Sequence, residues 1–342
     1  MLKKILTLPA LAGLVVVAAP ASRATTITQD FSGNPLTNGW SLFGEGSLFV
    51  WDATNQNLRV TWDSTRANSY FYHPIGTVIT RHDDFSFAFD LRLTDIASGV
   101  EPGKTGPLQL GFGFLNYTHA TSTNFIRGSF GSAPNVAGFD YYAWGFFDFG
   151  GTIFESPAAT TPAFISGVNS FAYSPVIVSA YDNELPTNQT VRVTMTYNAS
   201  NQTVAVTVLT NGLPTVQLPN LVLNSANGFS DTDDFHVDMY SVSSYSSAGD
   251  DYNSILAHGT VDNVVVTLPP PVQNLTGGFS NGVWQVEFAS RRNWFYTMER
   301  TVDFSAWTNV SATVSGHATD LFLQDSNPPA GRAFYRVRAA RP

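Results

Sequence analysis

Residues Thr190 to Leu209 read TVRVTMTYNASNQTVAVTVL. Two runs that alternate apolar and polar residues flank a polar break, and their seven apolar members are Val191, Val193, Met195, Tyr197, Val204, Val206 and Val208. Such period-two alternation is typical of β-strands with one buried face. The break at 198–202, NASNQ, has residue types that tolerate left-handed backbone angles and form side-chain-bonded turns. The stretch predicts an antiparallel hairpin whose burial contributes roughly 10 to 20 kcal/mol before chain entropy, so a second sheet must cover it.

Further strands are expected on both sides of this hairpin. In DFSFAFDLRLTDI (84–96), one face carries Phe85, Phe87, Phe89, Leu91 and Leu93, and the other, solvated face carries Ser86, Ala88, Asp90 and Arg92. ILAHGTVDNVVVTL (255–268) is a closing apolar strand. Turn signals separate the strands, and no segment has a helical period. The sequence therefore predicts an all-β protein, a two-sheet antiparallel jelly-roll sandwich.

The N-terminal segment 1–24 has the plan of a secretory signal peptide. Lys3 and Lys4 precede an apolar run, which is followed by Pro20 and small residues, so cleavage is expected after Ala21 or Ala24. A transmembrane anchor is the alternative, but prolines and a glycine interrupt a run that is only just long enough to span a bilayer. We expect a secreted protein, either released or held at the cell surface, with no membrane span after signal cleavage.

Three consecutive prolines, 269–271, mark a domain boundary because they favour extended backbone and cannot donate ladder hydrogen bonds. We expect a jelly-roll domain at 25–268, a proline linker at 269–275 and a small β domain at 276–342. The C-terminal part contains about five short strand-like pieces, such as GVWQVEFAS and AFYRVRAA. Its length is near the minimum for an independent core.

Residues 25–268 resemble the concanavalin A-like lectin/glucanase jelly roll, including laminin-G-like modules. The resemblance rests on DFSFAFDLRL, on the hairpin VRVTMTYNASNQTVAVTV with the Asn-Gly turn that follows it, and on GTVDNVVVTL. The C-terminal piece, with YTMERTVDFSAWTNV and FYRVRA, looks like a small β module, fibronectin-III-like, of the type found in secreted Verrucomicrobia proteins. These resemblances imply a fold rather than an activity, since this jelly roll serves lectins, adhesion modules, hydrolases and lyases.

Charge and cysteine content restrict the partners. The formal net charge is −9, and the acidic excess lies before the proline boundary, whereas 272–342 is slightly basic. Nucleic acid and anionic membranes are poor partners for such a surface, since binding to them needs a basic footprint. The chain has no cysteine, so disulfides and thiolate metal sites are excluded.

Catalytic motifs are weak. The sequence leaves enzymatic activity uncertain and favours a protein without it. Jelly-roll glucanases carry Glu-x-Asp-x-Glu on one strand, but no Glu here has Asp two residues later. GFSNG (278–282) matches the nucleophile-elbow pattern without the strand-to-helix context that it needs. The histidines are scattered and lack zinc-site spacing. No catalytic residue is predicted.

Two acidic loops form a candidate calcium site. The aspartates concerned are Asp231, Asp233, Asp234, Asp250 and Asp251. If the two loops meet at one rim of the sandwich, they offer the oxygen ligands that Ca²⁺ prefers. The alternative is that exposed loops of an acidic protein carry Asp for solubility and turn formation. Ca²⁺ is thus a possible cofactor and no other is expected.

The segment FDYYAWGFFDFG (139–150) is the best candidate ligand surface. Its proposed ligand-binding residues are Asp140, Tyr141, Tyr142, Trp144 and Asp148. Sugar rings pack their apolar faces on aromatic planes while carboxylates accept their hydroxyl hydrogens. The alternative is that most of these rings fill the core. The leading hypothesis is a secreted, non-catalytic protein that binds a polysaccharide or surface glycan or serves in cell-surface adhesion. The alternatives are a polysaccharide hydrolase or lyase and a structural surface protein.

Overall fold

The computed structural model describes residues 25–98, 110–126, 134–147, 153–167, 170–173, 185–217, 220–223, 235–246, 255–291, 294–317 and 319–340. The strands in these ranges are β1 (Thr25–Gln29), β2 (Ser41–Phe43), β3 (Phe49–Asp52), β4 (Asn57–Asp63), β5 (Ser69–Thr80), β6 (Phe85–Ser98), β7 (Leu110–Leu115), β8 (Val136–Phe147), β9 (Ile153–Gly167), β10 (Ser170–Tyr173), β11 (Thr190–Asn198), β12 (Thr203–Thr210), β13 (Leu213–Gln217), β14 (Leu221–Val222), β15 (His236–Ser244), β16 (Ile255–Leu268), β17 (Gln273–Ser280), β18 (Val283–Ala289), β19 (Phe295–Thr301), β20 (Thr308–Asn309), β21 (Val314–Ser315), β22 (Asp320–Asp325) and β23 (Phe334–Ala340). The helical turns in them are η1 (Pro35–Thr37), η2 (Gly46–Leu48) and α1 (Tyr117–Ala120). The predicted all-β class is confirmed.

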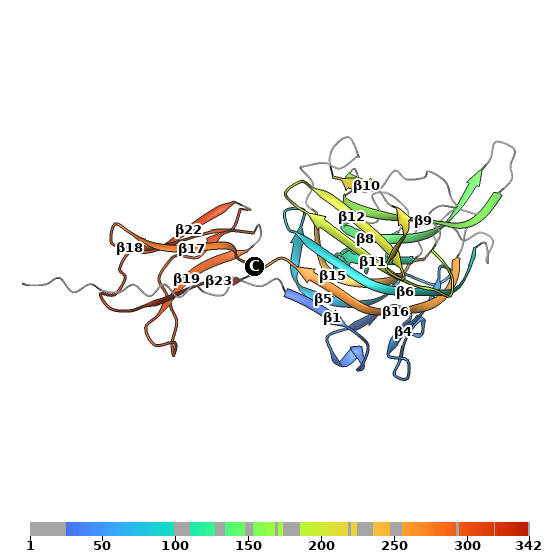
Figure 1. Ribbon diagram of the computed structural model, residues 1–342, viewed down its shortest axis with the longest axis horizontal. Coiled ribbons are helices and arrows are strands. Elements are labelled where there is room, and N and C mark those ends of the chain that lie inside the picture. The colour runs from blue at the N-terminus through green and yellow to red at the C-terminus, as the bar shows by residue number, and fades with distance from the viewer. Residues whose placement is uncertain are drawn as a thin grey trace, which may run out of the picture.

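Two antiparallel sheets build the larger part of the molecule. Sheet A has the order β13-β12-β11-β6-β16-β4-β3, and β1 also pairs with β16 and β14 with β12. Sheet B has the order β10-β9-β8-β7-β15-β5-β2. Figure 1 shows these strands gathered in one body, and the orange and red strands from β17 onward in a second body beside it.

The hairpin that the sequence predicts lies inside sheet A. β11 pairs with β12, with Val193 opposite Val208, and its other edge pairs with β6, with Val193 opposite Phe89. All seven predicted apolar side chains are buried, with exposed fractions of 0% to 6%. In the turn, the Asn198 side chain accepts hydrogen bonds from the backbone N–H groups of Ser200 and Asn201. The hairpin and its buried face are confirmed.

The core between the two sheets is largely aromatic. Phe89 of β6 stacks on Phe112 of β7, with ring centroids 4.2 Å apart, so this contact joins sheet A to sheet B directly. Tyr240 of β15 lies between Phe87 and Phe114, at 5.5 and 5.8 Å between ring centroids. The face of β6 that points into this core is the one that alternation predicts. The alternate residues of β6 lie on the outer face of sheet A, which points away from sheet B.

The C-terminal body has two small sheets of its own in the described ranges. One has the order β17-β18-β22, and the other has the order β20-β19-β21 with β23 also on β19. Phe288 of β18 and Tyr296 and Met298 of β19 lie in a separate buried cluster. β17 begins at Gln273, so the extended spacer is shorter than the predicted linker 269–275.

Polar contacts hold the two bodies together at the proline segment. Arg291, just after β18, donates from Nε to Oδ1 of Asp83, which precedes β6, at 2.7 Å, and both side chains are almost fully buried. Arg291 Nη1 also donates to the carbonyl of Pro269 at 3.3 Å, and the Tyr296 hydroxyl donates to the carbonyl of Pro271 at 2.9 Å. The proline segment is therefore hydrogen-bonded to the C-terminal body, and Arg291 joins that body to Asp83 of the larger one.

Candidate functional site

The predicted aromatic surface lies on β8, between β7 and β9 in sheet B. Tyr141 is opposite Leu110 on β7 and Thr160 on β9. The strand backbone includes four of the five predicted residues, namely Asp140, Tyr141, Tyr142 and Trp144. Their side chains lie outside the described part of the chain, as does Asp148 altogether. The glycan platform stays a prediction.

The predicted calcium ligands also lie outside the described residues. They are Asp231, Asp233, Asp234, Asp250 and Asp251, in the segments before β15 and before β16. In the ranges that the structure describes, no group of three or more His, Cys, Asp or Glu side chains is arranged to hold a metal ion. The calcium site stays a prediction.

A histidine pair lies where α1 packs at the end of sheet B. The rings of His119 and His236 meet edge to face, with centroids 5.6 Å apart. Asn135 joins them, because its Oδ1 accepts from the His236 backbone N–H at 2.8 Å and its Nδ2 is 3.0 Å from His119 Nδ1. Burial lowers the pKa of His119, and the neighbouring His236 lowers that pKa further. A neutral His119 at physiological pH fits a packing and hydrogen-bonding role.

Chemistry-bearing side chains gather instead on the outer face of sheet A. Alternation on β6 places Asp90, Arg92 and Thr94 there, and alternation on β16 places His258 and Thr260 beside them. Thr260 is opposite Arg92 of β6 on one side and opposite Arg59 of β4 on the other. Among the described residues, two hollows open on this face, which we name the Asp90 pocket and the His258 groove.

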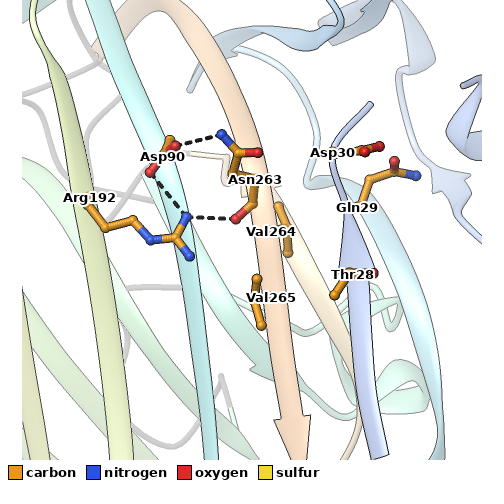
Figure 2. Close-up of a pocket in the computed structure, with 8 residues that line it drawn as sticks. All are labelled: Thr28, Gln29, Asp30, Asp90, Arg192, Asn263, Val264 and Val265. Atoms are coloured by element: carbon orange, nitrogen blue, oxygen red, sulfur yellow. Dashed lines mark hydrogen bonds and ion pairs between the residues drawn. The ribbon is translucent and has the colours of Figure 1, made fainter. Parts of the chain in front are cut away.

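The Asp90 pocket has a volume of about 460 Å³. It is lined by Thr28, Gln29, Asp30, Asp90, Arg192, Asn263, Val264 and Val265. Figure 2 shows Arg192 and Asn263 reaching toward Asp90 from opposite sides. Arg192 Nη1 donates to Asp90 Oδ1 at 3.1 Å and to the Asn263 carbonyl at 2.7 Å, and Asn263 Nδ2 donates to Asp90 Oδ2 at 2.8 Å. Both carboxylate oxygens of Asp90 are thus held in fixed positions.

The pocket forms where β16 changes its neighbour. β4 pairs with β16 up to Val261, and β1 takes over from Val264. Between them the ladder with β6 shifts register, and Asn263 adopts a left-handed φ of 48°. Asn tolerates this conformation better than most residues, because its short polar side chain bonds locally. The resulting bulge aims the Asn263 amide at Asp90.

Asp262 directly precedes Asn263, which lines the Asp90 pocket. Its Oδ1 accepts the Asn263 backbone N–H at 2.6 Å. The pKa of Asp262 is raised, chiefly by burial and also by the nearby carboxylates of Asp90 and Asp30. The hydrogen bond from Asn263 and the charge of Arg192 lower this pKa but do not cancel the increase. The ionised form of Asp262 is therefore disfavoured in the folded state.

Replacing Asp262 with Asn should raise the melting temperature slightly at pH 7. A carboxyl whose folded pKa lies above its unfolded value stabilises the fold less when ionised, so stability from Asp262 increases as pH falls through the raised pKa. Asn keeps the Oδ1 acceptor and removes the charge. The gain should stay below about 1 kcal/mol, because partly exposed charges are screened.

Thermal unfolding from pH 7 to pH 4 should show the advantage of Asp262→Asn shrinking on acidification. An advantage that is constant across this range would contradict the assignment, and exposed Asp320→Asn is the matched control.

The His258 groove is the larger hollow, with a volume of about 860 Å³. It is lined by Ser47, Leu48, Val50, Asp52, Asn55, Asn57, Arg59, Val60, Thr61, Arg92, Thr94, His258, Gly259 and Thr260. His258 Nδ1 is 2.8 Å from Asp95 Oδ1, at the edge of this hollow. Hydroxyl, amide, carboxylate, imidazole and guanidinium groups thus line one concave surface. Such a surface can form many hydrogen bonds with a polyhydroxylated molecule.

Sequence reasoning found part of this face. The pattern of 84–96 places Asp90 and Arg92 on the solvated side, and the structure confirms that. Arg192 and Asn263, which bond to Asp90, come from other strands. Arg59, which lies across Thr260 from Arg92, also comes from another strand, so no local spacing joins these residues. The available signal is the Asp262-Asn263 dipeptide, which interrupts the apolar pattern of the closing strand.

Comparisons with known proteins concern the fold. No protein-family model matches the sequence, and no curated protein matches it. Among solved structures, the chain is similar to a peanut lectin with a 9mer peptide, at 15% identity and a TM-score of 0.38 over 72% of this chain and 99% of that chain. It is also similar to lectin II from Ulex europaeus, at 12% identity and a TM-score of 0.39 over 71% and 99%. A sialidase is similar at 9% identity and a TM-score of 0.36, over 72% of this chain and 18% of that chain. At these TM-scores and identities, the neighbours show neither the family of this chain nor its ligand.

Proposed function

We propose that this is an exported, non-catalytic protein that binds carbohydrate on the outer face of sheet A. The jelly roll supplies a rigid support, because strands position side chains more firmly than loops do. The predicted signal segment 1–24 supports export, and polysaccharides are abundant outside cells. The C-terminal body then serves for attachment or spacing.

The observation that carries this proposal is the fixed polar network of the outer face. Asp90, held by Arg192 and Asn263, lines one hollow, and hydroxyl and amide groups line the other. A glycan presents alternating hydroxyl donors and acceptors, so it is recognised by side chains whose positions are set before binding. Both hollows are open to solvent, so one segment of a long polymer can bind in them while the rest of the polymer extends beyond the site.

The test is retention on a panel of immobilised polysaccharides, measured together with release of reducing ends and of unsaturated products. The purified protein should be retarded by at least one polysaccharide and should release neither product. Retention on none would reject the proposal. Release of reducing ends would instead identify a hydrolase, and unsaturated products a lyase.

A variant makes the test specific to this face. Asp90→Asn keeps the size of the side chain and removes the charge that Arg192 contacts. It should weaken retention by about tenfold if a ligand hydroxyl binds this carboxylate, since hydrogen bonds to charged groups contribute about 1.5 to 3 kcal/mol. Equal retention by Asp90→Asn and the parent would place the ligand away from the Asp90 pocket, and Asp320→Asn serves as the control with the same chemistry elsewhere.

A further inference from the structure

In the part of the chain that the structure describes, the acidic side chains of the His258 groove have hydrogen-bond partners and the arginine side chains do not. Among its acids, Asp52 accepts hydrogen bonds from the Thr54 and Asn55 backbones and from Asn55 Nδ2. Asp95, at the groove's edge, is bonded to His258. The carboxylates are thus already satisfied by neighbours of their own.

The two arginines of the groove are exposed and have no such partners. Within the described ranges, the side chains of Arg59 and Arg92 form no hydrogen bond and no ion pair, although the charge of Arg59 lowers the pKa of Asp52. The other described arginines of the large body behave differently. Arg66 pairs with Glu45 and Asp63, Arg192 pairs with Asp90, and Arg81 is buried and bonded to Gln202.

The strand register sets the spacing of the backbones that carry the two arginines. Arg59 and Arg92 both lie opposite Thr260, on either side of β16. Neighbouring strands are about 4.8 Å apart, so the two backbones are about 10 Å apart with a threonine hydroxyl between them. His258, two residues along β16 on the same face, adds imidazole nitrogen to the row. Such a row can hold anionic groups on a polymer along with its hydroxyls.

We propose that the His258 groove binds an anionic polysaccharide, with Arg59 and Arg92 contacting its carboxylate or sulfate groups. This inference rests on the proposed carbohydrate-binding function and names the class of glycan. Guanidinium groups bind both anions through paired hydrogen bonds, and Arg suits this role better than Lys. The acidic excess of the whole chain does not prevent it, because charges beyond about 8 Å are largely screened at physiological salt.

Matched polymers test the charge requirement. Dextran sulfate is compared with neutral dextran, and polygalacturonate is compared with its fully methyl-esterified form. The protein should be retained by at least one charged polymer at least about tenfold more strongly than by its uncharged counterpart, as expected for charge-assisted hydrogen bonds. The charged member that binds more tightly identifies the anion, sulfate or carboxylate. Equal retention on charged and neutral members would overturn this inference and leave carbohydrate binding intact, whereas retention on no glycan would overturn both.

Matched variants test the residues. The double variant Arg59→Gln, Arg92→Gln should lose about tenfold or more in retention on the charged polymer and keep the parent melting temperature, because both side chains are exposed and unpaired. The control is Arg66→Gln, Arg332→Gln, which changes the net charge equally and lies outside the groove. Equal loss in both double variants would indicate attraction by net charge alone and overturn the site, as would unchanged retention in the groove variant.

Discussion

Replacing Arg291 with alanine is expected to lower the free energy of unfolding by about 3 to 5 kcal/mol, the usual cost of removing one partner from a buried ion pair. Asp83 would remain buried, at 2% exposure, without its cation. Its Oδ2 would still accept from the Thr80 backbone and hydroxyl at 2.8 and 3.0 Å, but Oδ1 would lose the Arg291 bond at 2.7 Å. Alanine also removes the cation that lies over the Trp294 ring, 5.1 Å from its centroid.

Urea and thermal unfolding measure this cost, and a double-mutant cycle isolates the pair. Asp83→Ala should be destabilising as well, and Asp83→Ala combined with Arg291→Ala should cost clearly less than the sum of the two, because no buried charge is then left alone. Arg332→Ala, an exposed arginine in the same body, should change stability by less than about 0.5 kcal/mol. Additive losses, or a loss below about 1 kcal/mol for Arg291→Ala, would contradict a buried and coupled pair.

The ion pair also affects how the proposed binding face is presented. β16 carries His258 and Asn263 and ends at Leu268, and the carbonyl of the next residue, Pro269, accepts from Arg291. The strand that forms part of the proposed glycan-binding face therefore continues directly into the proline segment. Interfaces between domains are often small and polar enough to permit motion, whereas a buried ion pair at this junction restrains it.

The sequence predicts those features that depend on local alternation. It identifies the hairpin, the buried face of β6 and the solvated positions of Asp90 and Arg92, since period two decides which face each side chain takes. It does not predict contacts across strands, because alternation says nothing about which strand becomes the neighbour. Asp83 and Arg291 are 208 residues apart, and Asn263 meets Asp90 only through a bulge. The start of β17 at Gln273 escaped prediction because the proline run suggested a longer extended segment.

Phe89→Ala tests the two-layer arrangement itself, with an expected loss of about 3 to 5 kcal/mol in the free energy of unfolding. Phe89 has no exposed surface and its ring stacks on Phe112 of sheet B at 4.2 Å. Its centroid is also 6.2 Å from that of Phe139, on β8. Truncation would remove a contact that joins the two sheets and leave a cavity that rigid strands cannot close fully.

Ser86→Ala is the control, because Ser86 lies on the same strand but on its outer face, outside both hollows. It should change stability by less than about 0.5 kcal/mol, whereas Phe89→Leu should fall between the two, since it keeps part of the buried volume. Urea unfolding of the three variants gives the order directly, provided that the slope of free energy against urea stays equal to that of the parent. Equal, small losses at positions 86 and 89 would mean that both faces of β6 are solvated, which would contradict the sandwich and the outer-face site built on it.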